Sequence, residues 1–370
     1  MEEVLTPSTA NKRPSTGSGK TLPVQKTTRS RRSEVDFSHL GFGKEFADHM
    51  LTADFEDGEW KDAKIVPFQP LTISPANATL HYGQSIFEGI KAYKDPQGNP
   101  TIFRPDMNFK RFRKSAERLA MPPVPEEIFL EGMKQLVSLD RDWIPDGAGC
   151  SLYIRPFIFA TDEMIGVKPS EKYKFMIINS PAGPYYGKPV KLFVQEKYVR
   201  AFPGGVGAAK TSGNYAASLQ PTEIIKKMGY DQILWTDGHE HKYLQECGTM
   251  NVFVIIGNKA LTPDLSQGTI LAGVTRDSVI QLLGDRGIVV EERPVSIAEI
   301  LEADKNGTLK ELFGTGTAAS ISFVEEITYR DHTIKFDLSK WQVSPSILKE
   351  LDAIHTGKTA DKRGWNVSVD

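Results

Sequence analysis

The chain has 370 residues, of which 39% are apolar, 9% aromatic and 25% charged, fractions typical of a globular protein long enough for two domains. Its 45 Lys and Arg against 47 Asp and Glu give a net charge of −2, which favours neither a nucleic-acid nor a membrane partner. Its longest apolar run falls far short of the roughly 20 residues of a membrane-spanning helix, and two cysteines are too few for a disulfide framework.

The N-terminal segment is basic and polar. Val4 to Ser33 contains no acidic residue and is rich in Ser, Thr and Pro. Such a segment has too little apolar surface to offset its ordering entropy, so we expect a disordered tail over residues 1–35. Its composition resembles that of a mitochondrial transit peptide, but Glu2, Glu3 and the lack of an apolar helical face favour a cytoplasmic location, with the mitochondrion as the alternative.

The next part of the chain predicts a small α+β domain over residues 36–180. Asp106 is expected to cap one helix and Pro125 to open another, each with an apolar face. Turn-forming residues then predict an interdomain linker over 181–189. The predicted elements are strands around a loop over 67–93, helices over 106–120 and 125–139, and strands over 151–159 and 174–179.

The remaining residues, 190–370, predict a larger second α+β domain. Pro221 is expected to interrupt one helix, and Gly284 to end another. Because strands and helices mix without regular βαβ alternation, the sequence predicts an α+β fold rather than a doubly wound sheet. The predicted elements are strands over 190–195, 231–236, 241–245, 251–256 and 321–328, and helices over 215–228 and 275–283.

Gly314–Ala319 satisfies a lenient dinucleotide-binding fingerprint, which requires a helix immediately afterwards. The following residues, 321–328, instead predict a strand. A ligand-binding turn and a purely structural turn remain alternatives.

Asp237, His239 and His241 form a second candidate, because alternate residues on a strand share a face and can bind a metal ion. An exposed polar hairpin tip explains the same residues. We therefore assign no metal site.

Lys210 lies among small residues, and no Asp or Glu occurs between residues 197 and 222. A nucleophilic lysine must lose its proton, and both desolvation and the absence of carboxylates favour that loss. A flexible glycine-rich loop with an incidental lysine is the commoner explanation of such a stretch, so the local pattern leaves both interpretations open. Arg111, within the basic run 110–114, lies off the apolar helical stripe, and on its own pattern it predicts only a solvated charged face.

Six separated blocks, in order, resemble the branched-chain amino-acid aminotransferases, which are pyridoxal-phosphate enzymes of fold type IV. The resemblance runs from about Phe42 to the C-terminus. The blocks are His81–Gly89, Leu152–Pro156, Gly204–Tyr215, Leu244–Asn251, Leu271–Arg276 and Gly314–Ala318.

This resemblance implies a fold with the cofactor, pyridoxal 5′-phosphate, between two α+β domains. Lys210 would be the catalytic residue and carry the cofactor as a Schiff base. Tyr215 would bind the phenolic oxygen, and Glu246 the pyridine nitrogen. The residues implied around the phosphate are Arg111, Val274, Thr275 and Thr317.

The resemblance also implies the substrate site. Arg155 would pair with the distal carboxylate of glutamate or 2-oxoglutarate, while Thr249 and the Ala318 N–H would face the substrate carboxylate. Tyr82 and Val167 would reach in from a partner subunit, which implies a homodimer. The residues implied around the substrate side chain are Phe42, Tyr82, Phe87, Tyr153, Val167 and Tyr185.

The expected reaction is reversible transfer of the amino group of leucine, isoleucine or valine to 2-oxoglutarate. Alternatives are another fold type IV enzyme, such as a D-amino-acid transaminase or an aminodeoxychorismate lyase, a nicotinamide oxidoreductase, and a non-catalytic binding protein. The redox C-x-x-C of mammalian relatives is replaced by Ala319 and Ser322, so thiol regulation is not expected there.

Overall fold

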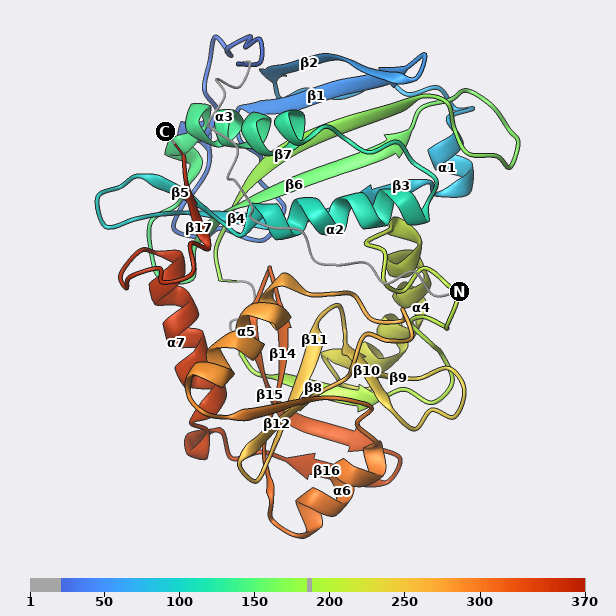
Figure 1. Cartoon of the computed structure of the whole chain (residues 1–370), viewed down its shortest axis with the longest axis vertical. Helices are drawn as coiled ribbons and strands as arrows, with labels where there is room; N and C mark the ends of the chain where they lie inside the picture. Colours follow the sequence, from blue (N-terminus) through green and yellow to red (C-terminus); the bar gives the residue numbers. More distant parts are fainter. Residues whose placement is uncertain (1–20, 185–187, 370) are drawn as a thin grey trace, which may run out of the picture.

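Two β-sheets with their helices form the molecule, one above the other (Figure 1). The structure, a computed structural model, describes residues 21–184 and 188–369. Over these residues the sheets have eight and nine strands, and the predicted α+β class is confirmed. None of the helices in these ranges has the length and apolarity needed to cross a membrane.

The first sheet is antiparallel throughout, with strand order β17-β5-β4-β6-β7-β1-β2 and β3 paired to β6. Its central strands are rich in β-branched and aromatic residues, which favour a pleated, buried surface. Its strands are β1 (His49–Glu56), β2 (Glu59–Pro67), β3 (Ser85–Phe87), β4 (Ile90–Lys94), β5 (Pro100–Phe103), β6 (Ser151–Ala160), β7 (Tyr173–Ala182) and β17 (Asn366–Ser368).

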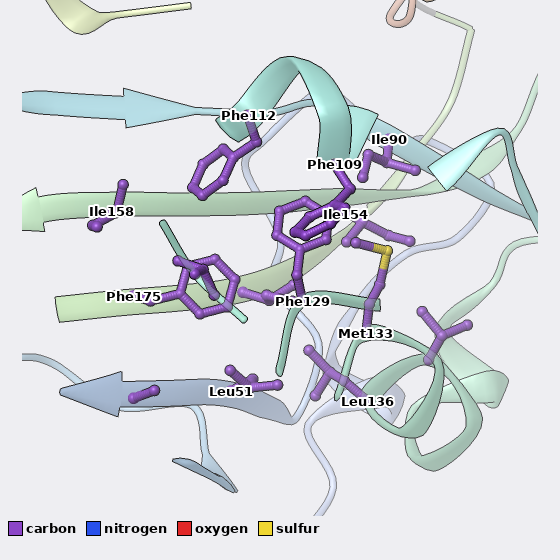
Figure 2. Close-up of a cluster of buried hydrophobic side chains, with 14 of the residues drawn as sticks. Leu51, Ile90, Phe109, Phe112, Phe129, Met133, Leu136, Ile154, Ile158 and Phe175 are labelled. Atoms are coloured by element: carbon purple, nitrogen blue, oxygen red, sulfur yellow. The ribbon is translucent and has the colours of Figure 1, made fainter. Parts of the chain in front are cut away.

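Three helices accompany this sheet: α1 (Ala78–Tyr82), α2 (Pro105–Arg118) and α3 (Gly132–Leu139). The N-cap of α2 is Arg104, so the expected cap at Asp106 is wrong by two residues. Pro105 takes a position that needs no N–H, and Asp106 lies in the first turn, where its negative charge complements the helix dipole. Phe109 and Phe112 of α2 pack with Phe129, which precedes α3, against the sheet (Figure 2). The two helices expected here are therefore present, whereas the short α1 lies where we expected only strands and a loop.

The second sheet is mixed, with strand order β10-β9-β8-β15-β14-β11-β12-β13 and β16 paired to β15. The pairs β8–β9, β8–β15 and β12–β13 are parallel. Its strands are β8 (Val190–Val194), β9 (Gln232–Thr236), β10 (Leu244–Cys247), β11 (Asn251–Ile256), β12 (Lys259–Thr262), β13 (Val289–Glu292), β14 (Leu309–Gly316), β15 (Ser320–Tyr329) and β16 (His332–Lys335). The helices of this part are α4 (Ser212–Lys227), α5 (Val274–Asp285), α6 (Ile297–Lys305) and α7 (Val343–His355).

The expected interruption of one helix and the expected end of another are both wrong. Pro221 lies inside α4 without ending it, since a proline removes one backbone hydrogen bond and the surrounding turns can keep theirs. Gly284 likewise lies within α5, and Gly287, with φ of 70°, adopts the left-handed conformation just beyond the helix.

Both ends of the described chain join the first sheet. Residues 21–35 depart from the expected disordered tail: Val24 forms a bridge with Ile65 of β2, and Leu22 packs on the core. At the other end β17 pairs with β5, so the last strand belongs to the first sheet although it follows the strands and helices of the second. Composition alone could not show either contact, because each depends on strands far away in the sequence.

The C-terminal residue of α7, His355, connects this helix to the first sheet. Its ring stacks on Tyr93 of β4 at 4.6 Å and meets Phe103 of β5 edge-on at 4.4 Å. Burial lowers the pKa of His355 to about 3 from its usual 6.5. The imidazole is therefore neutral in the folded protein at every pH near neutrality.

We expect His355→Phe to make the protein more resistant to acid. Because the folded pKa is depressed, the stability that His355 contributes is complete above pH 6.5 and is lost as the pH falls towards 3. Urea unfolding between pH 7 and pH 4 should show wild type losing stability relative to the variant, by at most about 1.4 kcal/mol per pH unit. A constant difference between the two proteins over this range would contradict the assignment.

Candidate active site

A cavity of about 440 Å³ lies between the two sheets and takes its walls from both. Residues separated by up to 277 positions meet there, from Phe42 to Ala319. Twelve of the predicted site residues line it: Phe42, Phe87, Arg111, Tyr153, Arg155, Lys210, Tyr215, Thr249, Val274, Thr275, Thr317 and Ala318.

Lys210 lies just before α4, at the end of the glycine-rich segment. Its Nζ donates a hydrogen bond to Tyr215 Oη at 3.1 Å and lies 5.0 Å from the ring centre of Phe87. Its backbone N–H donates to Ser115 Oγ at 3.0 Å, and its carbonyl accepts from the Phe87 N–H at 3.0 Å. The segment is therefore fixed on both sides, and the amine lies beside a phenol at the cavity wall.

Arg111 is buried on α2 and forms a two-pronged ion pair with Glu88. The bonds are 2.8 Å from Nε to Oε1 and 2.7 Å from Nη2 to Oε2, and Nη1 donates to the Ala272 carbonyl at 2.9 Å. Burial acts to raise the pKa of Glu88, but Arg111 outweighs it and the pKa lies below its usual value. The solvated charged face that the sequence pattern favoured for Arg111 is therefore wrong.

The N-terminus of α5 faces the same cavity through Val274 and Thr275. The first N–H groups of α5 have no acceptor within the helix, and Gly273, the N-cap residue, has no side chain that could accept a hydrogen bond from them. A Cβ at Gly273 would lie 1.9 Å from Asn251 Oδ1, so only glycine fits. An arginine has five N–H donors, and the bonds to Glu88 and Ala272 leave two. With a free helix N-terminus and the Thr317 hydroxyl, this donor set fits a phosphate group.

Glu246 lies on β10 behind the cavity wall. Its Oε2 pairs with Arg200 Nε at 2.8 Å, and its Oε1 accepts the N–H of Leu271, a wall residue, at 2.8 Å. Burial raises the pKa of Glu246 despite the pull of Arg200 in the opposite direction. The carboxylate is thus held in one orientation, with a cation beside it to support its charge.

An aromatic wall surrounds the remaining space. Phe42 meets Tyr153 edge-on at 4.8 Å. The Arg155 guanidinium lies 4.6 Å from the ring centre of Phe87 and donates to Tyr153 Oη at 3.1 Å. A Cβ at Gly89 would come within 2.1 Å of the same hydroxyl, so the width of the cavity depends on this glycine. The wall therefore combines apolar rings with the Arg155 guanidinium.

The glycine-rich turn between β14 and β15 lines the cavity through Thr317 and Ala318. Lys91 Nζ donates to the Ala318 carbonyl at 2.7 Å, and burial lowers the pKa of Lys91 to about 8. Because the strand β15 follows the turn where a dinucleotide site needs a helix, the dinucleotide fingerprint is wrong here.

Some predicted residues lie elsewhere. Tyr82 and Val167 are 40% and 90% exposed and do not line this cavity. Tyr185 lies outside the described residues. His239 and His241 form part of a polar loop ordered by the Asp237 carboxylate, and the described residues contain no group of three side chains able to hold a metal ion.

Several residues that contact the site residues were not predicted, among them Glu88, Lys91, Ser115 and Arg200. Of these four, only Glu88 belongs to a block that carried the resemblance, His81–Gly89. The others contact residues between 46 and 227 positions away, and no local pattern marks such partners.

Comparison with known proteins agrees with this geometry. Residues 85–327 match the family described as Amino-transferase class IV. A probable branched-chain-amino-acid aminotransferase of Staphylococcus epidermidis is 50% identical over 346 residues, which cover 92% of this chain and 96% of the relative. The predicted family resemblance is confirmed by these matches.

Solved structures are also similar. The branched-chain amino acid aminotransferase of Escherichia coli has a TM-score of 0.73 at 28% identity, covering 87% of this chain and 99% of that one. A T.th. enzyme of the same name, complexed with N-(5′-phosphopyridoxyl)-L-glutamate, has a TM-score of 0.70 at 26% identity, covering 86% and 98%.

Proposed function

The chain belongs to the class IV aminotransferase family, and from that membership we propose that it transfers the amino group of leucine, isoleucine or valine to 2-oxoglutarate. The observation that carries this proposal is the meeting, in one cavity, of the Lys210 amine, a phosphate-type donor set and an aromatic wall with one arginine. The names of the relatives support the branched-chain substrates, and the phosphopyridoxyl-glutamate ligand of the T.th. enzyme supports glutamate as the partner substrate.

The cofactor proposed for this cavity is pyridoxal phosphate. When bound, it supplies an electron sink for the negative charge left on the substrate Cα. Arg111, Thr317 and the first N–H groups of α5 would hold the phosphate, and Lys210 Nζ would anchor the cofactor covalently. Glu246 would accept the N–H of the pyridine ring, and Arg200 keeps that carboxylate in place.

Lys210 also has the position of the general base. An amine freed from the cofactor can take the proton from the substrate Cα and return it, provided that it stays within hydrogen-bond reach. The Tyr215 hydroxyl at 3.1 Å and the backbone contacts of Lys210 restrict where the amine can move. The proton transfer is therefore assigned to Lys210 Nζ, with Tyr215 orienting it.

One cavity must accept both an apolar and an acidic side chain. The rings of Phe42, Phe87 and Tyr153 supply the apolar surface for branched side chains. Arg155 supplies a charge for the distal carboxylate of glutamate. Thr249 and the Ala318 N–H line the same cavity and would bind the carboxylate that both substrates share.

A homodimer belongs to the same proposal. Tyr82 and Val167 match family positions that enter a partner's site, and in the single chain they are exposed beside further apolar residues. Leu80 and Ile165 are 64% and 76% exposed. A second copy of the chain would cover this apolar surface.

Lys210→Ala should abolish transamination, with a loss of at least about 10³-fold in kcat, because the proposed anchor and base are both removed. Leucine and 2-oxoglutarate are the assay substrates. In wild type, borohydride reduction should fix a pyridoxyl group on Lys210, and peptide mapping should find it there. Lys197→Ala, outside the cavity, is the matched control and should behave as wild type. A Lys210→Ala protein with near wild-type turnover would refute the assignment.

Arg155→Leu should separate the two substrates. A charge-assisted hydrogen bond contributes about 1.5–3 kcal/mol, so kcat/KM for glutamate should fall by about 10- to 150-fold while that for leucine changes little. Arg113→Leu, an exposed arginine on α2, should affect neither substrate. Equal losses for glutamate and leucine would remove Arg155 from its proposed role.

Sedimentation at micromolar concentration should give twice the 41.1 kDa mass of the chain. Val167→Glu places a charge on the proposed contact surface and should shift the protein towards monomer with lower activity. Val289→Glu, at a 57% exposed position on β13, is the control and should remain dimeric. A fully active wild-type monomer would disprove the dimer.

A further inference from the structure

One face of α2 carries a buried polar row of four residues, of which the proposed reaction uses only Arg111. Arg104, which caps the helix, is followed by Asn108, Arg111 and Ser115 at spacings of four, three and four residues, the pattern of a single helical face. Their exposed fractions are 6%, 2%, 8% and 1%. A buried polar row is costly unless each member has a partner, so the partners show what the row does.

At the N-terminal end, Arg104 reaches α5. Its Nη1 donates to Ser278 Oγ at 2.7 Å, and its Nη2 pairs with Asp277 Oδ2 at 2.6 Å. These partners lie one turn after Val274, where the proposed phosphate site begins. The guanidinium also lies 4.9 Å from the ring centre of Trp365. Arg104 thus connects the start of α2 to the start of the helix that faces the phosphate position.

Towards the other end, Ser115 reaches the lysine segment. Its Oγ accepts the backbone N–H of Lys210 at 3.0 Å. Lys210 follows a glycine-rich stretch, which has little stiffness of its own, so its position depends on such external contacts. Between the two ends, Asn108 Nδ2 donates to Glu88 at 2.7 Å, and Arg111 binds the same carboxylate.

We propose that Arg104 and Ser115 are positioning residues, which fix the start of α5 and the Lys210 segment to one helix and thereby set the spacing between the phosphate site and the amine. The inference rests on the proposed cofactor. α2 accompanies the first sheet, whereas α5 and Lys210 follow the linker and accompany the second. Neither side chain needs to touch the cofactor to affect it, since a helix is stiff along its axis and its contacts keep a fixed separation.

The test measures cofactor binding apart from turnover. Apoprotein of Ser115→Ala and Arg104→Lys is titrated with pyridoxal phosphate by equilibrium dialysis, and urea unfolding of the same apoproteins gives their stability. Arg104→Lys keeps the charge but loses the planar fork that reaches both partners. We expect its Kd to rise about tenfold, the loss of one charge-assisted hydrogen bond. For Ser115→Ala we expect a shift in the pH midpoint of the bound cofactor's absorbance, together with a several-fold higher Kd.

Ser344→Ala is the matched control. Ser344 is another fully buried helical serine, and it donates to Glu311; neither residue lines the cavity. It should lose urea stability while leaving both the Kd and the absorbance midpoint at wild-type values. Should Arg104→Lys fail to fold, Asp277→Asn weakens the same contact from its partly exposed side and should raise the Kd in the same direction.

The inference is overturned if Ser115→Ala and the Arg104 or Asp277 variant lose stability as Ser344→Ala does but bind the cofactor as wild type does. Failure of the proposed function looks different. In that case wild-type apoprotein itself binds no pyridoxal phosphate, and there is no spacing for α2 to set.

Discussion

The buried ion pair between Glu88 and Arg111 is the contact on which the cavity depends. A guanidinium in this position would be prohibitively costly without a carboxylate, and a carboxylate without a guanidinium equally so. The two-pronged geometry satisfies both and leaves Arg111 with donors to spare. Those N–H groups and the α5 dipole would then attract the phosphate of the proposed cofactor, because Glu88 already balances the positive charge of Arg111 and the helix dipole favours an anion.

The pair also determines which parts of the chain must meet. Glu88 lies between β3 and β4, Arg111 lies on α2, and the third bond of Arg111 goes to the Ala272 carbonyl just before α5. One side chain therefore connects two elements of the first sheet to the second. The cavity lies at this junction, which explains why its walls come from both sheets and why a lysine from one can face aromatic rings from the other.

Much of the fold followed from periodicity. The apolar faces of α2 and α3 and the short apolar runs of β6, β7 and β11 are local signals. The structure has these elements close to the predicted bounds, with the π-helical turn Glu127–Glu131 forming the first part of the helix that continues as α3. The five-residue α1 is too short for such a signal. Residues 21–35 have a polar composition, and only their contacts with β2 and the core order them.

The site residues likewise divide into those that a local sequence pattern marks and those that it does not. The small, uncharged surroundings of Lys210 are a local signal compatible with a reactive lysine, but an incidental lysine in a flexible loop explains the same pattern. Arg111 had no such signal, because its counter-ion lies 23 residues away. Glu88, Ser115 and Arg200 contact site residues that lie far from them in the sequence. The resemblance therefore supplied the residues that would touch ligands, but not the side chains that hold those residues in place.

The aromatic contacts of Arg155 offer a physical reason why one cavity could serve the two kinds of substrate that we propose. A buried cation facing leucine would lose hydration and gain no partner. Here the guanidinium lies 4.6 Å from the ring centre of Phe87 and 5.2 Å from that of Tyr153, and it shares a hydrogen bond with the Tyr153 hydroxyl. These ring faces stabilise the charge when no carboxylate is present. Under the proposed function, the rings that would supply apolar surface to a branched side chain would thus also make the cation for glutamate tolerable, and the same residues would meet both requirements without separate pockets.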